Sequence, residues 1–260
     1  MAGAHNVKSV AAIYDIHGNL PALDAVLADI DRLAPDLILV GGDLASGPMP
    51  RETLDRLMRL GERARFICGN SDREVVAQYD GLPQAGGDDE SPFAPALAWT
   101  AERITLVQRD FLASLPEHAA LEVDGLGEVL FCHGSPRSDE EIITSATPEG
   151  RLREMMASVK QDIVVCGHTH MQFELQIDGK RVINAGSVGM PYEGQTGAYW
   201  LLLGPEVSFR RTLYDVERAA NQIRASGLPG AEEFAQENVL SSPPASEATA
   251  IFERMATEGR

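Results

Sequence analysis

Several short apolar runs in this chain end in side chains that can bind divalent cations. Seven such side chains follow the runs, and in chain order they are Asp15, His17, Asp43, Asn70, His133, His168 and His170. The runs read as β-strands and span residues 10–14, 37–40, 64–68, 128–132 and 162–166. Because α/β proteins place their ligands at the ends of strands, this order predicts one site to which several strands contribute.

The first third of the chain alternates strand-like and helix-like segments. Asn19 is placed to cap a helix, and Pro21 lies in its first turn, where a missing N–H costs little. A second helix is expected over residues 51–60, between the strands at 37–40 and 64–68. This β-α-β order favours strands buried between helices.

The rest of the chain has a different pattern. Residues 81–91 are rich in Gly, Pro and acidic residues and are typical of an exposed loop, and residues 99–115 predict one long helix. Six strands are expected at residues 120–123, 128–132, 162–166, 173–177, 181–184 and 198–203. Asp178 and Gly179 lie where a tight hairpin turn is needed. The pattern indicates an α/β (α+β) chain with two sheets rather than one.

Composition narrows the partners that the chain can bind. Its 260 residues are 44% apolar, which suits one sizeable domain or a domain with an appendage. The formal net charge of −17 repels nucleic-acid backbones and anionic membranes, so nonspecific binding to either is not expected. An anionic substrate therefore needs a local positive charge, which bound cations supply. No secretory signal or membrane span is expected either.

The three cysteines each end a strand-like run and lack metal-finger spacing; they are Cys68, Cys132 and Cys166. We expect buried, reduced thiols that pack like small apolar residues, in preference to metal ligands or redox groups. A reducing, cytoplasmic location follows from this expectation.

The residue types of the seven candidates suit hard to borderline cations such as Mn²⁺, Fe and Zn²⁺. Asp15 and His17 are two residues apart, so both are expected to face one side, as alternate strand residues do. A site with two ions needs a bridging carboxylate, and Asp43 is the best candidate. Taken alone, the Asp-x-His motif could also be a helix cap, and the GHTH motif could be a turn with solvated histidines. The motifs together contain four of the six histidines of the chain, which favours a metal site.

The ordered motifs resemble those of the calcineurin-like metallophosphoesterases, and in this sequence they read DIHGN, GGD, GNSD, HGS and GHTH. The resemblance covers about residues 8–215 and is strongest to a bacterial branch described as predicted phosphodiesterases or as diadenosine-tetraphosphatase-like. It implies a four-layer αββα sandwich with two mixed β-sheets and the metal site at the strand ends. The implied organisation is a phosphoesterase domain over residues 1–215, with a loop-helix insertion at about 80–118, and a helical appendage over residues 216–260.

The resemblance also implies two divalent metal ions, with Mn first and Fe, Ni or Zn as alternatives. The first ion would be held by Asp15, His17, Asp43 and His170, and the second by Asp43, Asn70, His133 and His168. A hydroxide between the ions would attack phosphorus in a small phosphate ester. Asn70 and His133 are the residues expected to take part in catalysis, and the Asn70 amide would also donate to a phosphate oxygen. The oligomeric state stays open.

One position departs from the resemblance. Many relatives carry GNH where this chain has Ser71, and their His is paired with an Asp where this chain has Ser46. Serine has no useful proton near neutral pH, so we expect Ser71 to contact substrate without acting as an acid. In the family that this chain resembles, the branch with Cys or Ser at this position tends toward phosphodiesters, so the resemblance favours a phosphodiesterase. The alternatives are a phosphomonoesterase or dinucleoside-polyphosphate hydrolase, a non-catalytic scaffold of the same fold, and a TIM-barrel metal hydrolase.

Other residues give weaker predictions. Arg137 follows the HGSP motif and is placed either to clamp a substrate phosphate or to form a surface salt bridge. Arg73 has the same two interpretations. Asp72 is expected to hold its loop, and residues 184–189 to support the site through backbone turns. The loop at residues 81–91 either covers the site or is an ordinary exposed loop.

Overall fold

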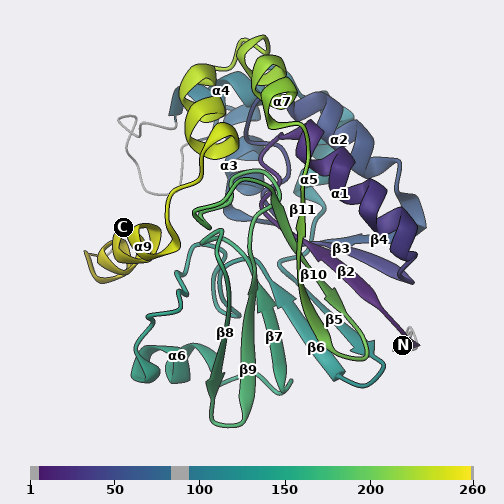
Figure 1. Ribbon diagram of the computed structural model, residues 1–260, viewed down its shortest axis with the longest axis vertical. Coiled ribbons are helices and arrows are strands. Elements are labelled where there is room, and N and C mark those ends of the chain that lie inside the picture. Colours follow the sequence, from purple (N-terminus) through teal and green to yellow (C-terminus); the bar gives the residue numbers. More distant parts are fainter. Residues whose placement is uncertain (1–5, 83–93, 259–260) are drawn as a thin grey trace.

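Two β-sheets pack face to face in the computed structural model, which describes residues 6–82 and 94–258 (Figure 1). Their facing side chains form one apolar core, to which Leu39 of one sheet and Phe131 and Val165 of the other contribute. The prediction of two sheets is confirmed. Most of the loop predicted over residues 81–91 lies outside the described residues.

The first sheet has five strands in the order β11-β10-β2-β3-β4. Its parallel strands are β2 (Val10–Ile13), β3 (Leu37–Val40) and β4 (Ala64–Phe66). Two antiparallel strands complete it, namely β10 (Ala198–Leu203) and β11 (Val207–Thr212). Ile13 of β2 is paired with Val40 of β3, so these two strands end side by side.

The second sheet has six strands in the order β1-β5-β6-β7-β9-β8. In chain order they are β1 (Asn6–Val7), β5 (His118–Val123), β6 (Gly127–Cys132), β7 (Ile163–Cys166), β8 (Gln172–Ile177) and β9 (Lys180–Ala185). Strands β6, β7 and β9 run parallel to one another, so both sheets are mixed. The predicted hairpin at Asp178 and Gly179 is confirmed, since both residues have positive φ and join β8 to β9.

Helices cover the outer faces of both sheets. The first sheet packs on α1 (Leu20–Leu33), α2 (Pro50–Met58), α3 (Asn70–Tyr79), α4 (Ala94–Ala101) and α5 (Leu106–Ala113), and a short 3₁₀ turn, η1 (Gly61–Arg63), precedes β4. The second sheet packs on α6 (Glu149–Met156) through Leu152, Met155 and Met156. These four layers confirm the αββα sandwich.

The expected start of α1 is confirmed, and one expected helix is wrong. The Asn19 side chain accepts a hydrogen bond from the Ala22 N–H at 3.3 Å and caps α1. The single helix predicted over residues 99–115 is instead the two helices α4 and α5. Thr105 and Gln108 form a reciprocal capping box that begins a new helix at Leu106.

The C-terminal part of the chain is helical, as expected. It comprises α7 (Val216–Arg224), α8 (Ala231–Ala235), the π-helical turn η2 (Gln236–Leu240) and α9 (Ala245–Glu258). Helices α7 and α8 share a small apolar cluster with η2, and Figure 1 shows α9 separated from them by a connecting segment. Among the described helices, none is long and apolar enough to cross a membrane.

The three cysteines are free thiols. Cys132 and Cys166 are buried at the ends of β6 and β7, in the core under α6, as expected. Cys68 differs from the expectation because it is only partly buried. Burial raises the pKa of Cys166 to about 12, which favours the protonated thiol near neutral pH. The cytoplasmic location stays a prediction.

Candidate metal centre

The predicted ligands lie on loops that leave the ends of adjacent strands. Asp15 and His17 follow β2, and Asp43 follows β3. These loops remain paired beyond the strands, since the Asp15 N–H donates to Gly42 O at 3.2 Å and the His17 N–H to Asp43 O at 2.9 Å. The loops after β6 and β7 are joined in the same way by a bond from Gly167 N–H to His133 O at 2.8 Å. Backbone pairing therefore sets the distances between the loops.

Five of the predicted ligands converge on one buried point. Asp15, His17 and His170 can each offer one donor atom within 4.8 Å of the others, and so can Asp15, Asp43 and His133. His170 Nε2 lies 3.4 Å from Asp15 Oδ1, and His17 Nε2 lies 3.5 Å from Asp43 Oδ2.

His133 lies between the two carboxylates. Its Nε2 is 3.5 Å from Asp43 Oδ2 and 3.8 Å from Asp15 Oδ1. The other two predicted ligands adjoin His133. Asn70 Oδ1 is 3.2 Å from His133 Nε2, and the His168 ring centroid is 5.2 Å from the His133 ring centroid. The structure therefore gathers all seven predicted residues in one cluster.

Most of the predicted ligands lie on loops with left-handed backbone conformations, and not at alternate positions of a strand as the sequence suggested. Strand β2 ends at Ile13, so Asp15 and His17 are not alternate strand residues, and that part of the expectation is wrong. Five of the predicted ligands instead have left-handed backbone conformations, with φ of 52° at Asp15, 47° at His17, 54° at Asp43, 66° at His168 and 60° at His170. Asp and His tolerate this region better than most residues, and such strain collects at functional sites.

Gly69 and Gly167 are required because the carboxylates of Asp43 and Asp15 lie directly beside their backbones. A Cβ on Gly69 would lie 2.2 Å from Asp43 Oδ1, and a Cβ on Gly167 would lie 2.5 Å from Asp15 Oδ2. Both distances are shorter than nonbonded atoms tolerate. Glycine at these positions lets each carboxylate reach the centre.

Asp72 ties two ligand loops together, as predicted. Its buried carboxylate accepts from the Asp43 N–H at 2.9 Å, the Leu44 N–H at 2.9 Å and the Gly69 N–H at 3.0 Å. Burial and the neighbouring Asp43 raise the pKa of Asp72 to about 7. The carboxylate thus fixes the loop after β3 relative to the start of α3.

Residues 184–189 support the site, as predicted, but through side-chain hydrogen bonds as well as through the expected backbone contacts, such as Gly189 N–H to Asp15 O at 3.0 Å. The Asn184 amide donates to Gly167 O at 2.6 Å and to Thr169 Oγ1 at 3.0 Å. The Ser187 hydroxyl donates to Asp15 O at 2.7 Å. Loops from both sheets are thereby joined around the ligands.

Ser71 is buried beside Asp43. Its backbone N–H donates to Asp43 Oδ1 at 2.9 Å, and its hydroxyl oxygen has no hydrogen-bond partner among the described residues. Ser46 contributes through its backbone, with its carbonyl oxygen 3.2 Å from His17 Nδ1. The free hydroxyl of Ser71 agrees with a contact role at the edge of the site.

The two arginines considered from the sequence are held by acidic side chains. Arg137 pairs with Glu141, with Nε to Oε2 at 3.1 Å, and 43% of its side chain is exposed. Arg73 pairs with Asp139 at 3.0 Å and Glu140 at 2.6 Å. The salt-bridge interpretation therefore describes both residues as they stand, and a phosphate clamp at Arg137 stays a prediction.

The electrostatics of the site call for positive charge. Burial alone would raise the pKa of Asp43, but the His133 imidazole outweighs it and holds that pKa well below its usual range. Burial lowers the pKa of His133, but the neighbouring Asp43 carboxylate raises it, and the net result is a pKa of about 10. Burial and His133 lower the pKa of His168 to about 4. His133 therefore favours its charged form beside the two carboxylates.

Some supporting groups could not be found from sequence. Met190 O lies 2.8 Å from His170 Nδ1, and Gly41 O lies 2.9 Å from His133 Nδ1. Such carbonyl contacts fix the ring so that Nε2 faces the centre. Every residue has a carbonyl, so only the fold reveals these partners.

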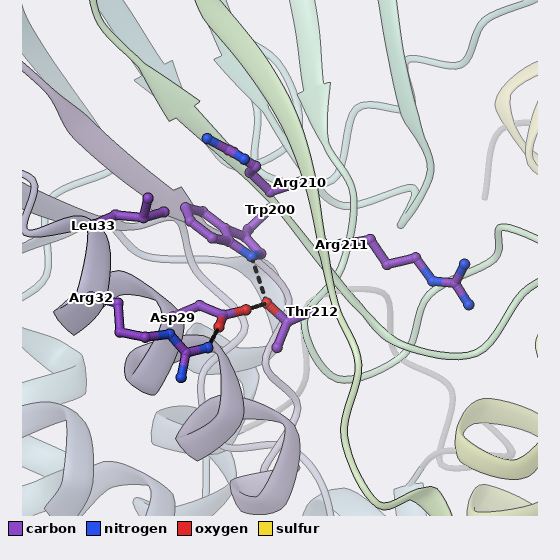
Figure 2. A pocket seen from close by; sticks show the side chains of 7 residues that line it. All are labelled: Asp29, Arg32, Leu33, Trp200, Arg210, Arg211 and Thr212. Atoms are coloured by element: carbon purple, nitrogen blue, oxygen red, sulfur yellow. Dashed lines mark hydrogen bonds and ion pairs between the residues drawn. The ribbon is translucent and has the colours of Figure 1, made fainter.

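A separate hollow of about 250 Å³ opens beside α1 and the β10–β11 hairpin. Figure 2 shows the residues that line it, namely Asp29, Arg32, Leu33, Trp200, Arg210, Arg211 and Thr212. Thr212 Oγ1 donates to Asp29 Oδ2 at 2.6 Å and accepts from Trp200 Nε1 at 3.0 Å, so these polar groups largely satisfy one another. None of the predicted metal ligands lines this hollow.

The residues at the strand ends fit divalent cations. Two buried carboxylates face three buried imidazoles, and Asp15 Oδ1 is buried without a hydrogen-bond partner among the described residues. His170 Nε2 lies 3.4 Å from this oxygen. A buried carboxylate oxygen that accepts no hydrogen bond is costly unless a cation meets it. A site of oxygen and nitrogen donors between the sheets of an αββα sandwich defines the class of metallophosphoesterases.

Comparison with known proteins names the family. A profile described as the calcineurin-like phosphoesterase superfamily domain matches residues 9–203, and the chain belongs to that superfamily. It is therefore a hydrolase that acts on phosphoester bonds, in a family that depends on metals.

Three similar proteins illustrate the range of the family. The uncharacterized protein MJ0912 of Methanocaldococcus jannaschii is 29% identical over 247 residues, which cover 86% of this chain and 95% of that protein. A crystal structure of a metallophosphoesterase from Sphaerobacter thermophilus is 27% identical in sequence and has a TM-score of 0.68. The match covers 91% of this chain and 99% of the Sphaerobacter chain. A symmetrical bis(5'-nucleosyl)-tetraphosphatase of Baumannia cicadellinicola is 32% identical over 149 residues, 56% of this chain and 49% of that protein.

Proposed function

We propose that the chain is a phosphodiesterase that uses two divalent metal ions to hydrolyse a small or nucleotide-like phosphodiester. The observation that carries the proposal is the pair of buried carboxylates, Asp15 and Asp43, with imidazole nitrogens 3.4–3.8 Å from their oxygens. Two cations would supply a water of lowered pKa as the nucleophile and would neutralise phosphate oxygens. Mn²⁺ is the metal that we propose for the assays.

The ligand sets follow the clustering of the side chains. Asp15, His17, Asp43 and His170 would hold one ion. Asp43, Asn70, His133 and His168 would hold the other. Asp43 belongs to both sets, and its position between His17 and His133 supports this bridging role.

The remaining residues bind and orient the substrate. We propose that the Asn70 amide N–H donates to a phosphate oxygen in place of its present partner, Glu74 Oε1 at 3.3 Å. The buried Ser71 hydroxyl, which is free of partners among the described residues, would donate to another. Arg137 would contact an outer part of the substrate. With no His at position 71, a leaving group of low basicity is favoured. The preference for a diester comes from the family resemblance, in which the branch with Cys or Ser at this position tends toward diesters.

The test is hydrolysis of bis(p-nitrophenyl) phosphate and p-nitrophenyl phosphate, side by side, with added Mn²⁺ and with a chelated control. We expect metal-dependent turnover of the diester and little of the monoester. Asp43→Asn is expected to reduce turnover to the level of the chelated control. Asp36→Asn is the matched control, since Asp36 is exposed and, among the described residues, its side chain accepts from the Lys8 and Ser9 backbone N–H groups alone. A monoester preference would contradict the proposal.

A second candidate is a dinucleoside-polyphosphate hydrolase. It is favoured by the 32% identity to a protein named as a symmetrical bis(5'-nucleosyl)-tetraphosphatase, although the match spans only 49% of that protein. Diadenosine tetraphosphate in the same assay separates the candidates. Faster release of nucleotide from it than of nitrophenol from the diester would favour this second function.

A further inference from the structure

The C-terminal helix α9 lies outside the part of the chain that the family profile matches, yet it contacts the loops that carry the metal ligands. The profile ends at residue 203, and α9 begins at Ala245. Thr249 Oγ1 lies 3.4 Å from the sulfur of Met171, directly after His170. The contacts described below tie α9 to the site at further points.

One anchor fixes α9 to the segment that follows His133. Glu253 of α9 accepts from Arg151 Nη2 with its two oxygens at 2.6 and 2.8 Å. The same carboxylate accepts from the buried hydroxyls of Thr144 at 2.6 Å and Thr147 at 3.1 Å. These charge-assisted bonds are partly shielded from water, since the Arg151 and Glu253 side chains are 22% and 21% exposed. They hold the helix in one position.

A second anchor fixes the turn before α9 to the loop that follows Gly189. The Ser242 hydroxyl donates to Pro191 O at 2.8 Å and accepts from the Glu193 N–H at 2.9 Å. The Gly194 N–H donates to Pro243 O at 2.9 Å. The C-terminal segment therefore pairs with three backbone groups of this loop, namely Pro191 O, Glu193 N–H and Gly194 N–H.

The same loop carries Tyr192, which holds the predicted ligand His170 in two ways. The Tyr192 N–H donates to His170 O at 3.1 Å. The Tyr192 ring stacks on the His170 ring, with centroids 4.9 Å apart and planes at 27°. Phe252 of α9 lies beside Tyr192, with ring centroids 6.2 Å apart. A continuous series of rings thus runs from α9 to His170.

We infer that Phe252 and Tyr192 are positioning residues for the metal centre, and that α9 sets the orientation of the His170 imidazole. His170 Nδ1 is already fixed by Met190 O, so the ring can still tilt about that contact unless a neighbour blocks it. Stacking on Tyr192 blocks the tilt, and Phe252 keeps Tyr192 in place. Groups that orient a metal ligand in this way typically change metal affinity about 10–100-fold when they are removed. The inference rests on the proposed metal site.

The test measures Mn²⁺ affinity by calorimetric titration of chelator-treated, full-length protein. Phe252→Ala is expected to weaken one of the two binding steps about tenfold, because only the ion held by His170 depends on the stack. Ile251→Ala is the matched control, since Ile251 is the neighbouring residue on α9 and is 42% exposed. Unchanged affinity in Phe252→Ala, or an equal loss in Ile251→Ala, would overturn the inference.

A second pair of variants covers the case in which Phe252→Ala lowers the melting temperature of the metal-free protein. Tyr192→Phe keeps the ring and is expected to keep wild-type affinity, whereas Tyr192→Leu is expected to lose about tenfold. Equal affinities in these two variants would overturn the inference. Because the readout is metal affinity, a protein that binds two ions but hydrolyses neither ester contradicts only the proposed function. A wild-type protein that binds no Mn²⁺ contradicts the metal site and this inference together.

Discussion

Replacement of Asp72 by alanine tests how the ligand loops are held. The Asp72 carboxylate accepts three hydrogen bonds from the buried backbone N–H groups of Asp43, Leu44 and Gly69. Asp72→Ala removes all three acceptors at once. The side chain is fully buried, so water cannot readily take their place.

The expected loss of stability follows from the number of donors left without partners. Each buried donor that loses its acceptor costs about 1–3 kcal/mol, so three donors give an upper range of about 3–9 kcal/mol. Part of this is offset, because burial and Asp43 raise the pKa of Asp72 to about 7 and its ionised form is therefore costly. We expect a net loss near the lower limit, about 3 kcal/mol, which lowers the melting temperature by about 6–12 °C.

The assay is urea unfolding of chelator-treated protein, compared with Asp36→Ala. Asp36 also accepts two backbone N–H groups, from Lys8 at 2.7 Å and Ser9 at 2.9 Å, but it is exposed. In Asp36→Ala, water can accept from the two N–H groups in place of the carboxylate, so the free energy of unfolding should fall by less than about 1 kcal/mol. Asp72→Asn keeps one oxygen and should lose about half as much as Asp72→Ala. A loss in Asp72→Ala no larger than that of the control would refute the reasoning.

Three further predictions concern the site. Ser71→Ala should lower diester turnover less than about tenfold, and a loss above about a hundredfold in kcat would show that Ser71 acts in proton transfer. Arg137→Gln should raise the KM for the diester about five- to tenfold and leave kcat unchanged, because Arg137 is expected to contact the substrate equally in the ground and transition states. An unchanged KM would mean that Arg137 only forms the salt bridge with Glu141. Mn²⁺ affinity should rise about tenfold per pH unit from about pH 6 to 9, because the pKa of His133 is raised to about 10 and its proton must leave before it can bind metal. Calorimetry in buffers of different ionisation enthalpy should detect the release of this proton, and a pH-independent affinity would contradict the assignment.

The sequence predicted those parts of the fold that have a local signature. Apolar runs of four to six residues gave most strands of both sheets, and Asn19 marked the start of α1. Strand β11 was missed because it is an edge strand with charged residues, including Arg210 and Arg211, next to each other. The break at Thr105 was visible in principle, since Thr105 and Gln108 have the spacing of a capping box.

The residues of the candidate site could be predicted from the sequence, but their backbone conformations could not. The seven candidate residues were named from their order in the chain, and their role as metal ligands stays a prediction. The left-handed conformations at Asp15 and His17 were not foreseen. An Asp or His is compatible with several backbone regions, and the choice between them depends on the pairing with the next loop. The contact of α9 with the site was also beyond sequence reasoning. An amphipathic pattern shows that a helix has an apolar face but does not show which surface receives it.

Anomalous diffraction from crystals grown with Mn²⁺ tests the central claim most directly. Two anomalous peaks at the ends of β2, β3, β6 and β7, with the Asp43 carboxylate between them, are the result that we predict. Ions in proteins of this kind are about 3.5–4 Å apart, so the peaks should be separated by that distance. A protein that shows no peak there, or a single peak away from Asp15 and Asp43, would contradict the dinuclear site.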